Sequence, residues 1–280
     1  MFDRDFRRKL SQKLRERLEA GPGTTPEPAS GAEEPVGEIT VPSGLAWVAP
    51  PGLPEQPLSL AEFMGGRELT LDSGRLLVVE GYGKRVLEEL ALTGLKLASH
   101  ELARVLERGP LVIFDLETCG FGGCPVFLIG LLEWDGDRLE LVQYLAEDLD
   151  QEAALLEASL DRLARAGGLV SYNGRTFDLP FLKERAIWHQ QAFPLLGPHF
   201  DLLPIARKRI GKSVPNHKLQ TLETCLLARG RQGDVPGAEI ADHYFQYAAT
   251  RDLAALVPIM AHNAFDLVSL AQILELLAGD

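Results

Sequence analysis

The sequence has few cysteines and no long uncharged apolar run, and both shortages exclude classes of protein. Cys119, Cys124 and Cys225 are an odd number of cysteines in 280 residues, which argues against a disulfide framework. Cys119 and Cys124 form a C-x4-C pair without the second pair that a structural zinc site needs, so reduced thiols are expected. No stretch of 18 or more uncharged apolar residues occurs, and the charged N-terminus is unlike a secretory signal. We therefore expect a cytoplasmic protein without a membrane partner.

Basic residues are outnumbered in this chain, and they are unevenly distributed. The 28 Lys and Arg against 40 Asp and Glu give a net charge of −12, whereas nucleic-acid-binding surfaces are usually basic. A nucleic-acid partner is not excluded, because a divalent-metal site is itself rich in carboxylates and one local basic patch can contact phosphates. Residues 202–222 are the candidate patch, since they contain no acidic residue and include Arg207, Lys208, Arg209, Lys212 and Lys218. The same composition is typical of a solvated helix end followed by a flexible loop.

The chain divides into three segments. Residues 1–20 place apolar side chains at four-residue intervals among Arg, Lys and Glu, which predicts an amphipathic helix. We expect this helix to pack on its own domain, with docking of a protein partner as the alternative. Residues 21–57 are rich in Pro, Gly, Ser and Glu and predict a linker or disordered arm. Residues 75–280 carry the apolar runs of a folded domain.

Strand-like and helix-like runs fill residues 75–280 and predict an α/β fold. Strand patterns occur at 75–80, 111–117, 125–134, 138–145 and 168–174. Helical patterns occur at 98–106, 150–168, 178–190, 219–230 and 252–279. The Asp-Gly-Asp turn at 135–137 predicts a hairpin, so at least two of the strands are antiparallel. The pattern is that of a sandwich with a mixed sheet flanked by helices.

Two acidic residues end the strand predicted at 111–117. Asp115 and Glu117 are two positions apart, so both side chains project from the same face of the sheet. Two neighbouring carboxylates in a partly desolvated place repel each other unless a positive charge lies between them. A hard divalent cation such as Mg²⁺ or Mn²⁺ supplies that charge and prefers oxygen ligands. Solvation of a strand end is the alternative explanation of this pair.

Three further polar residues follow the same logic. Asp178 begins a predicted helix, where a helix N-cap is by itself the preferred explanation. His262 and Asp266 are four residues apart on the last predicted helix and therefore share one helical face. Because apolar residues surround them, they must be paired, solvated in a cleft or bound to something.

Three segments, in this order, resemble the exonuclease motifs of the DEDD superfamily of ribonuclease H-like 3'-5' exonucleases. They are FDLET at 114–118, YNGRTFDLPFL at 172–182 and HNAFD at 262–266. The middle segment is similar to the second motif of the proofreading domain in family B DNA polymerases. The chain also resembles the bacterial YprB-type ribonuclease H-like domain family, including a segment like HFDLLPIARK. The resemblance covers roughly residues 75–280 and implies an α/β ribonuclease H-like three-layer sandwich with a mixed sheet flanked by helices.

The resemblance also implies the members of the site. Asp115, Glu117, Asp178 and Asp266 would be ligands of two Mg²⁺ or Mn²⁺ ions that clamp a phosphodiester. His262 would match the Tyr or His that orients or deprotonates the attacking water, at the four-residue spacing of the Tyr-containing branch. The substrate would be a single-stranded or frayed 3' end of DNA or RNA, and the products nucleoside 5'-monophosphates. Residues expected to contact it are Thr118, Asn173, Arg207, Lys208, Lys212 and Lys218.

Two other functions are consistent with parts of this pattern. A catalytically weak or inactive ribonuclease H-like module would bind nucleic acid without cutting it, although retention of all four acids and His262 argues against this. A hydrolase of small molecules would use Asp115 and Glu117 as an acid/base pair, but it leaves Asp178 and Asp266 without a role.

Overall fold

The structure is a computed structural model that describes residues 52, 58–96, 104–231 and 233–278. The predicted N-terminal helix, nearly all of the predicted linker arm and most of the helix predicted at 98–106 lie outside the described residues. The outer limits predicted for the main domain also stay predictions. One strand, β1, pairs with β2 and precedes residue 75, where the predicted domain begins.

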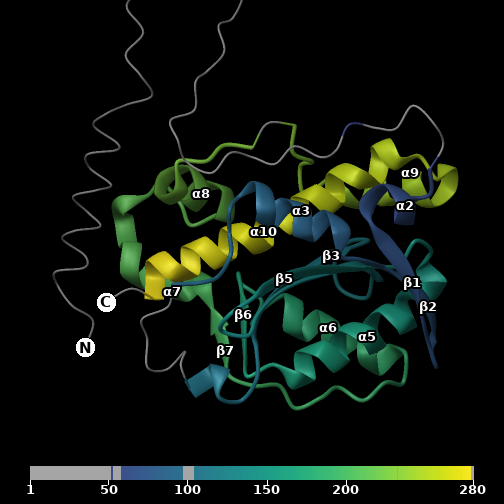
Figure 1. The fold of residues 1–280 in the computed structure, drawn as a ribbon, viewed down its shortest axis with the longest axis horizontal. Coiled ribbons are helices and arrows are strands. Elements are labelled where there is room, and N and C mark those ends of the chain that lie inside the picture. Colours follow the sequence, from purple (N-terminus) through teal and green to yellow (C-terminus); the bar gives the residue numbers. More distant parts are fainter. Residues whose placement is uncertain (1–51, 53–57, 97–103, 232, 279–280) are drawn as a thin grey trace, which may run out of the picture.

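A mixed sheet forms the centre of the described molecule (Figure 1). Its strands run in the order β1-β2-β5-β4-β3-β6-β7. All pairs from β1 to β3 are antiparallel, whereas β6 pairs with β3, and β7 with β6, in parallel. The mixed sheet predicted from sequence is therefore confirmed. The strands are β1 Gly66–Leu71, β2 Gly74–Val79, β3 Leu111–Thr118, β4 Val126–Trp134, β5 Leu139–Leu145, β6 Gly168–Ser171 and β7 His199–Asp201.

Helices cover both faces of the sheet and make three layers (Figure 1). Helices α5 and α6 lie against one face, and α10 crosses the other together with α3, α8 and α9. The helices are α2 Leu60–Met64, α3 Gly81–Glu89, α5 Glu152–Arg165, α6 Asp178–Trp188, α7 Leu202–Ile210, α8 Leu219–Leu227, α9 Ile240–Thr250 and α10 Leu253–Ala278, with 3-10 turns η1 Leu149–Gln151 and η2 Gly211–Ser213. The predicted three-layer α/β arrangement is confirmed.

The hairpin between β4 and β5 forms at the predicted Asp-Gly-Asp turn. Asp135 Oδ1 accepts hydrogen bonds from the backbone N–H groups of Asp137 (2.9 Å) and Arg138 (2.8 Å). Gly136 has φ +108°, a backbone conformation that residues other than glycine rarely adopt. The turn chemistry therefore sets the register in which β4 and β5 pair.

Strand β3 separates two apolar cores by simple alternation. Leu111 and Ile113 belong to the core on the α10 side, whereas Val112 and Phe114 belong to the core beneath α5 and α6. Side chains alternate between the faces of a strand, so Asp115 and Glu117 continue the row that faces α10. The chemistry of this molecule is therefore to be sought between β3 and α10.

Helix α10 is apolar around most of its circumference, as expected of a helix buried on all sides. By length and composition alone it is long enough to cross a membrane, but 78% of its most apolar window is buried inside the protein. It contacts β3, β4, α8 and α9. Its polar residues His262, Asn263 and Asp266 lie among tightly packed apolar side chains, where each needs a hydrogen-bond or ion-pair partner.

Candidate active site

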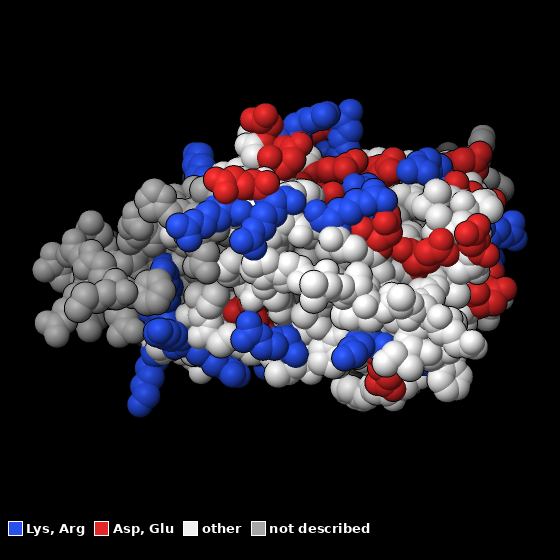
Figure 2. Space-filling view, turned by 90° about the horizontal axis from the view of Figure 1, so that it is seen from below, with Lys and Arg blue, Asp and Glu red and all other residues white. Residues whose placement is uncertain are grey.

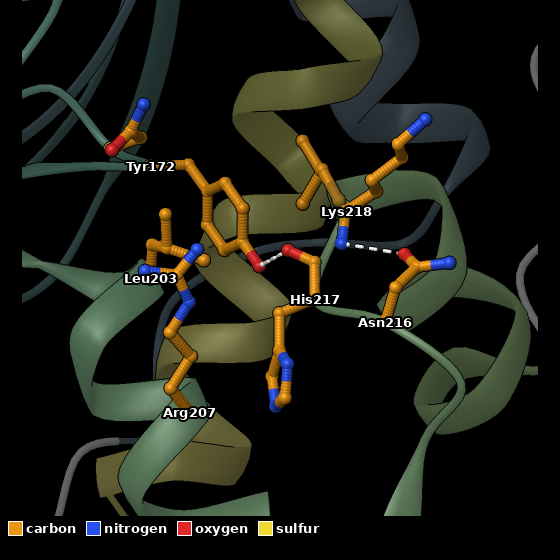
Figure 3. Close-up of a pocket in the computed structure, with 8 residues that line it drawn as sticks. Tyr172, Leu203, Arg207, Asn216, His217 and Lys218 are labelled. Atoms are coloured by element: carbon orange, nitrogen blue, oxygen red, sulfur yellow. Dashed lines mark hydrogen bonds between the residues drawn. The ribbon is translucent and has the colours of Figure 1, made fainter. Parts of the chain in front are cut away.

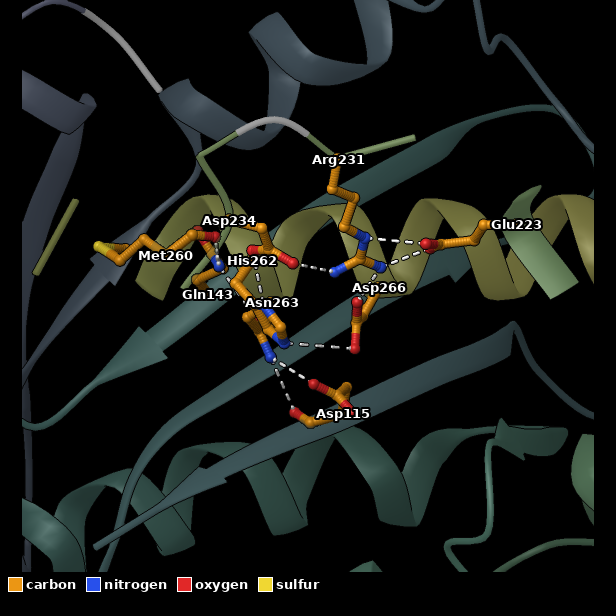
Figure 4. A network of polar contacts seen from close by, with 9 residues as sticks. All are labelled: Asp115, Gln143, Glu223, Arg231, Asp234, Met260, His262, Asn263 and Asp266. Atoms are coloured by element: carbon orange, nitrogen blue, oxygen red, sulfur yellow. Dashed lines mark hydrogen bonds and ion pairs between the residues drawn. The ribbon is translucent and has the colours of Figure 1, made fainter. Parts of the chain in front are cut away.

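Asp115 is held by a chain of hydrogen bonds that starts two strands away. Asn263 Nδ2, on α10, donates to Asp115 Oδ2 at 2.9 Å. Gln143 Nε2, on β5, donates to Asn263 Oδ1 at 2.9 Å and to the Met260 carbonyl at 2.8 Å (Figure 4). Because Gln143 and Asn263 are fully buried, this chain fixes the orientation of the Asp115 carboxylate.

A glycine makes the approach of α10 to β3 possible. Gly130 on β4 is the register partner of Asp115. A Cβ atom at this position would lie 2.0 Å from Asn263 Oδ1 and 2.8 Å from a methyl carbon of Leu267. Any side chain there would push α10 away from the sheet and separate Asn263 from Asp115.

Asp178 begins α6 and is buried, and the backbone of Leu116 on β3 hydrogen-bonds to it. The N-cap position of α6 is Phe177, so Asp178 does not take the N-cap position that sequence offered as its alternative explanation. A Cβ atom on Gly174 would come within 3.0 Å of Asp178 Oδ2, so the glycine of the turn leaves space for the carboxylate.

The turn from Asn173 to Asp178 is ordered by a residue that sequence did not single out. Asp201 Oδ1 accepts the backbone N–H of Asn173 at 2.8 Å, and its Oδ2 accepts that of Arg175 at 3.2 Å. The same carboxylate caps α7 through the Leu203 N–H. This buried aspartate therefore fixes both the turn before Asp178 and the start of α7, which explains the HFDLLPIARK segment structurally.

The three acids from β3 and α6 occupy one electrostatic environment. Burial, followed by the charges of Glu117, Asp266 and Asp178, raises the pKa of Asp115 well above its ordinary range. Burial is also the main reason that the pKa of Glu117 rises to about 8, with Asp266 and Asp178 adding to the rise and His262 opposing it. Burial raises the pKa of Asp178 to about 7, although backbone N–H groups oppose it. These carboxylates are therefore near one another, and the charge of His262 offsets only part of the effect of burial and repulsion.

Asp266 is near this cluster but is already paired with a cation. Arg231 binds Asp266 Oδ1 and Glu223 with one Nη atom, and Asp234 Oδ2 at 3.1 Å with the other (Figure 4). The Arg231 side chain is only 5% exposed. Sequence reasoning missed this arginine and its partner Asp234, and nothing in the local pattern of residues 228–239 signals them.

His262 belongs to the same network. Its Nδ1 lies 2.7 Å from Asp234 Oδ1, and its Nε2 lies 3.7 Å from Asp266 Oδ2. Burial lowers the pKa of His262, but the hydrogen bond to Asp234 and the charges of Asp266 and Glu117 outweigh it and raise the pKa to about 9. This raised pKa favours the protonated imidazole at neutral pH, which donates a hydrogen bond from Nδ1 to Asp234 and forms an ion pair with Asp266 through Nε2.

The carboxylates of this site are the chemical type of ligand that a hard divalent cation prefers, but their side chains are not arranged around a common point. Buried carboxylates that repel one another are what Mg²⁺ and Mn²⁺ bind, and Asp115, Glu117 and Asp178 meet that description. Within the described ranges, however, no group of three or more His, Cys, Asp and Glu side chains is placed to hold a metal ion. Asp266 can bind a metal ion only while it also keeps its ion pair with Arg231, or after that ion pair breaks.

The residues predicted to contact substrate divide into two groups. Asn173, Arg207 and Lys218 line one pocket of about 600 Å³ together with Tyr172 (Figure 3). Lys208 on α7 and Lys212 on η2 do not line it. Thr118, at the end of β3, uses its hydroxyl to donate to the Gly120 carbonyl at 2.7 Å.

The basic segment 202–222 combines helix and loop. It comprises α7, η2, the irregular residues 214–218 and the first turn of α8, so the helix end followed by a loop, which was one of the two interpretations, does form. Arg207 on α7 and Lys218 at the end of the irregular stretch line the same pocket.

Comparison with known proteins places this chain in a family and finds a relative and a structural neighbour. A family model described as the RNase H superfamily matches residues 112–278. The uncharacterized protein YprB of Bacillus subtilis (strain 168) is 33% identical over 178 residues, which are 61% of this chain and 43% of that protein. The chain thus spans less than half the length of this relative. The family B DNA polymerase of Pyrobaculum calidifontis is a structural neighbour at a TM-score of 0.49 and 19% identity, over 59% of this chain and 24% of the polymerase.

Proposed function

Because the chain belongs to the RNase H superfamily, we propose that it is a metal-dependent 3'-5' exonuclease that hydrolyses phosphodiester bonds of DNA or RNA. The observation that carries the proposal is the cluster of buried carboxylates between β3, α6 and α10. Burial and mutual repulsion raise the pKa values of Asp115 and Glu117, and burial raises that of Asp178. Such a cluster lowers the stability of the fold unless a bound cation neutralises it, which is why it indicates a functional site. The 3'-5' polarity rests only on the resemblance of the three motifs to those of the DEDD exonucleases.

Asp115, Glu117 and Asp178 would hold Mg²⁺ or Mn²⁺, with Asp266 contributing to a second ion. When bound, the ions would activate a water and stabilise the leaving 3' oxygen. Asn263 keeps Asp115 oriented through its hydrogen bond. Asp234 fixes His262 Nδ1, so Nε2 is the atom that holds or releases a proton on the side of Asp266.

A second function is favoured by one specific contact. The Arg231 guanidinium already neutralises Asp266, and among the described side chains no metal-binding group is assembled. A ribonuclease H-like module that binds nucleic acid without cutting it would have this arrangement. The two functions differ in a direct test, because only the first requires a divalent cation and Asp115 for product release.

The test uses single-stranded DNA and RNA oligonucleotides labelled at the 5' or the 3' end, with Mn²⁺, Mg²⁺ or a chelator. We expect a ladder of 5'-labelled products, early release of the 3' label as a mononucleotide, and no reaction in the chelator. Asp115→Asn should abolish the reaction, whereas Asp161→Asn, an exposed acid on α5, serves as the matched control and should not. Full activity of Asp115→Asn would refute the exonuclease, and binding without cleavage by the wild type would establish the second function.

A further inference from the structure

We propose that the pocket between Tyr172, Arg207 and the start of α8 is a nucleotide subsite, which takes one nucleoside monophosphate unit of a single strand beside the acidic site. This inference rests on the proposed function and names how that site holds its substrate. The pocket has a volume of about 600 Å³, within the range of roughly 300 to 1,000 Å³ that small-ligand sites occupy.

The pocket and the acidic cluster share one turn of chain. Tyr172 and Asn173 line the pocket, and the next residue, Gly174, lies against the Asp178 carboxylate. Asp201 holds the Asn173 N–H and caps α7, the helix that carries Arg207. A strand whose phosphodiester reached Asp178 would therefore have an adjacent nucleotide next to Tyr172 and Arg207.

The wall of the pocket is fixed by one hydrogen bond. The Tyr172 hydroxyl donates to the His217 carbonyl at 2.5 Å. Burial raises the pKa of Tyr172 well above its ordinary range, so the hydroxyl remains a donor at neutral pH. The bond ties the end of β6 to the segment before α8 and holds the aromatic ring rigidly, as a surface for a base or sugar requires.

Several polar groups at the pocket can still form ion pairs or hydrogen bonds with a ligand. No ion pair among the described residues involves Arg207 or Lys218, and His217 Nε2 is buried with no hydrogen-bond partner among them. In Figure 3 the Arg207 and His217 side chains flank the space below the Tyr172 ring, whereas the Lys218 side chain extends away toward the rim. Arg207 is therefore the principal anchor for a phosphate, and Lys218 is an outer one.

The charge of the surroundings supports an anionic ligand. Residues 202–222 contain no acid in a chain of net charge −12. Figure 2, which views the molecule from the side of α5 and α6, shows Lys and Arg side chains toward the left, the end at which α7 lies in Figure 1, and more Asp and Glu toward the top and right. The phosphate of a nucleotide and the apolar surfaces of Leu203 and Leu219 match this combination of cation and apolar wall.

The test measures binding without cleavage. Fluorescence anisotropy of 5'-labelled dT and rU 12-mers is recorded in a chelator over a series of salt concentrations, for the full chain and its variants. We expect Arg207→Ala to weaken binding at least tenfold and to lower the salt slope by about one. Arg207→Lys should keep the slope and recover part of the affinity. Arg138→Ala, an exposed arginine just before β5, is the control and should change affinity less than twofold.

The arms of the experiment separate the possible results. Unchanged affinity and salt slope in Arg207→Ala would overturn the subsite even if the chain cleaves oligonucleotides. Arg207-dependent binding would support it even if no cleavage is found, in which case the exonuclease fails and the subsite does not. Free nucleoside 5'-monophosphate is titrated as competitor, and if it binds as tightly as the 12-mers with the same dependence on Arg207, the pocket is a site for free nucleotides and the proposal is wrong.

Discussion

Replacing Glu117 with Gln should stabilise the metal-free protein, and the gain should depend on pH. Glu117 is buried, and burial together with Asp266 and Asp178 raises its pKa from 4.5 to about 8. A carboxyl with a raised pKa in the folded state contributes stability that is fully present below pH 4.5 and is lost as the pH rises through about 8. Glutamine resembles the protonated form at every pH, so the variant avoids this loss.

The size of the effect follows from the shift in pKa. One pKa unit corresponds to about 1.4 kcal/mol, so the rise from 4.5 to about 8 is worth roughly 5 kcal/mol above pH 8 and roughly 3 kcal/mol at pH 7. Neighbouring carboxylates share the repulsion, which makes these values upper limits for a single substitution. The gain should be near zero at pH 4.5.

Urea denaturation in a chelator at several pH values between 4.5 and 9 measures this difference. The stability of the variant relative to the wild type should increase with pH up to about 8 and then level off. Mn²⁺ should reduce or reverse this gain because the wild type binds the ion better. Glu184→Gln, which removes an exposed carboxylate from α6, is the control. If the difference between Glu117→Gln and wild type is the same at all pH values, the carboxylates do not form a mutually repelling cluster.

Three further substitutions test the surroundings of the site. Arg231→Met leaves three carboxylates without their shared buried guanidinium and should cost about 3 to 5 kcal/mol in urea denaturation, with partial recovery in Arg231→Lys. Gly130→Ala places a Cβ atom 2.0 Å from Asn263 Oδ1 and should cost about 1 to 3 kcal/mol; Gly122→Ala, which meets nothing within 4 Å, should be neutral. Glu152→Gln removes the charge that binds the buried arginine of α6 and should cost about 3 kcal/mol at neutral pH. Burial alone would raise the pKa of Glu152, but hydrogen bonds, first of all from this arginine, outweigh burial and lower it. The cost of Glu152→Gln should therefore shrink as the pH falls through the lowered pKa, and a cost independent of pH would contradict the assignment.

The order of β3, β4 and β5 and the position of Asp115 and Glu117 were predictable because the signals are local. An apolar run of strand length, an Asp-Gly turn and a two-residue spacing each involve neighbours in sequence. The elements without such signals were missed, among them β1, β7, α3 and α9. Strand β7, for example, spans only His199–Asp201 and is stabilised by pairing with β6, which its own sequence does not show.

Sequence patterns alone predicted the mixed α/β sandwich, and the spacing placed Asp115 with Glu117, and His262 with Asp266, on shared faces. The four acids and His262 were selected as one site by the resemblance of three motifs. Only the tertiary structure decided what each of them contacts. Arg231 and Asp234 lie in a segment without periodicity, and they reach Asp266 and His262 because the chain folds back over α10. The protonation of His262 and the partner of Asp266 depend on charges brought together from distant parts of the chain, and such distances are set by packing and not by local pattern.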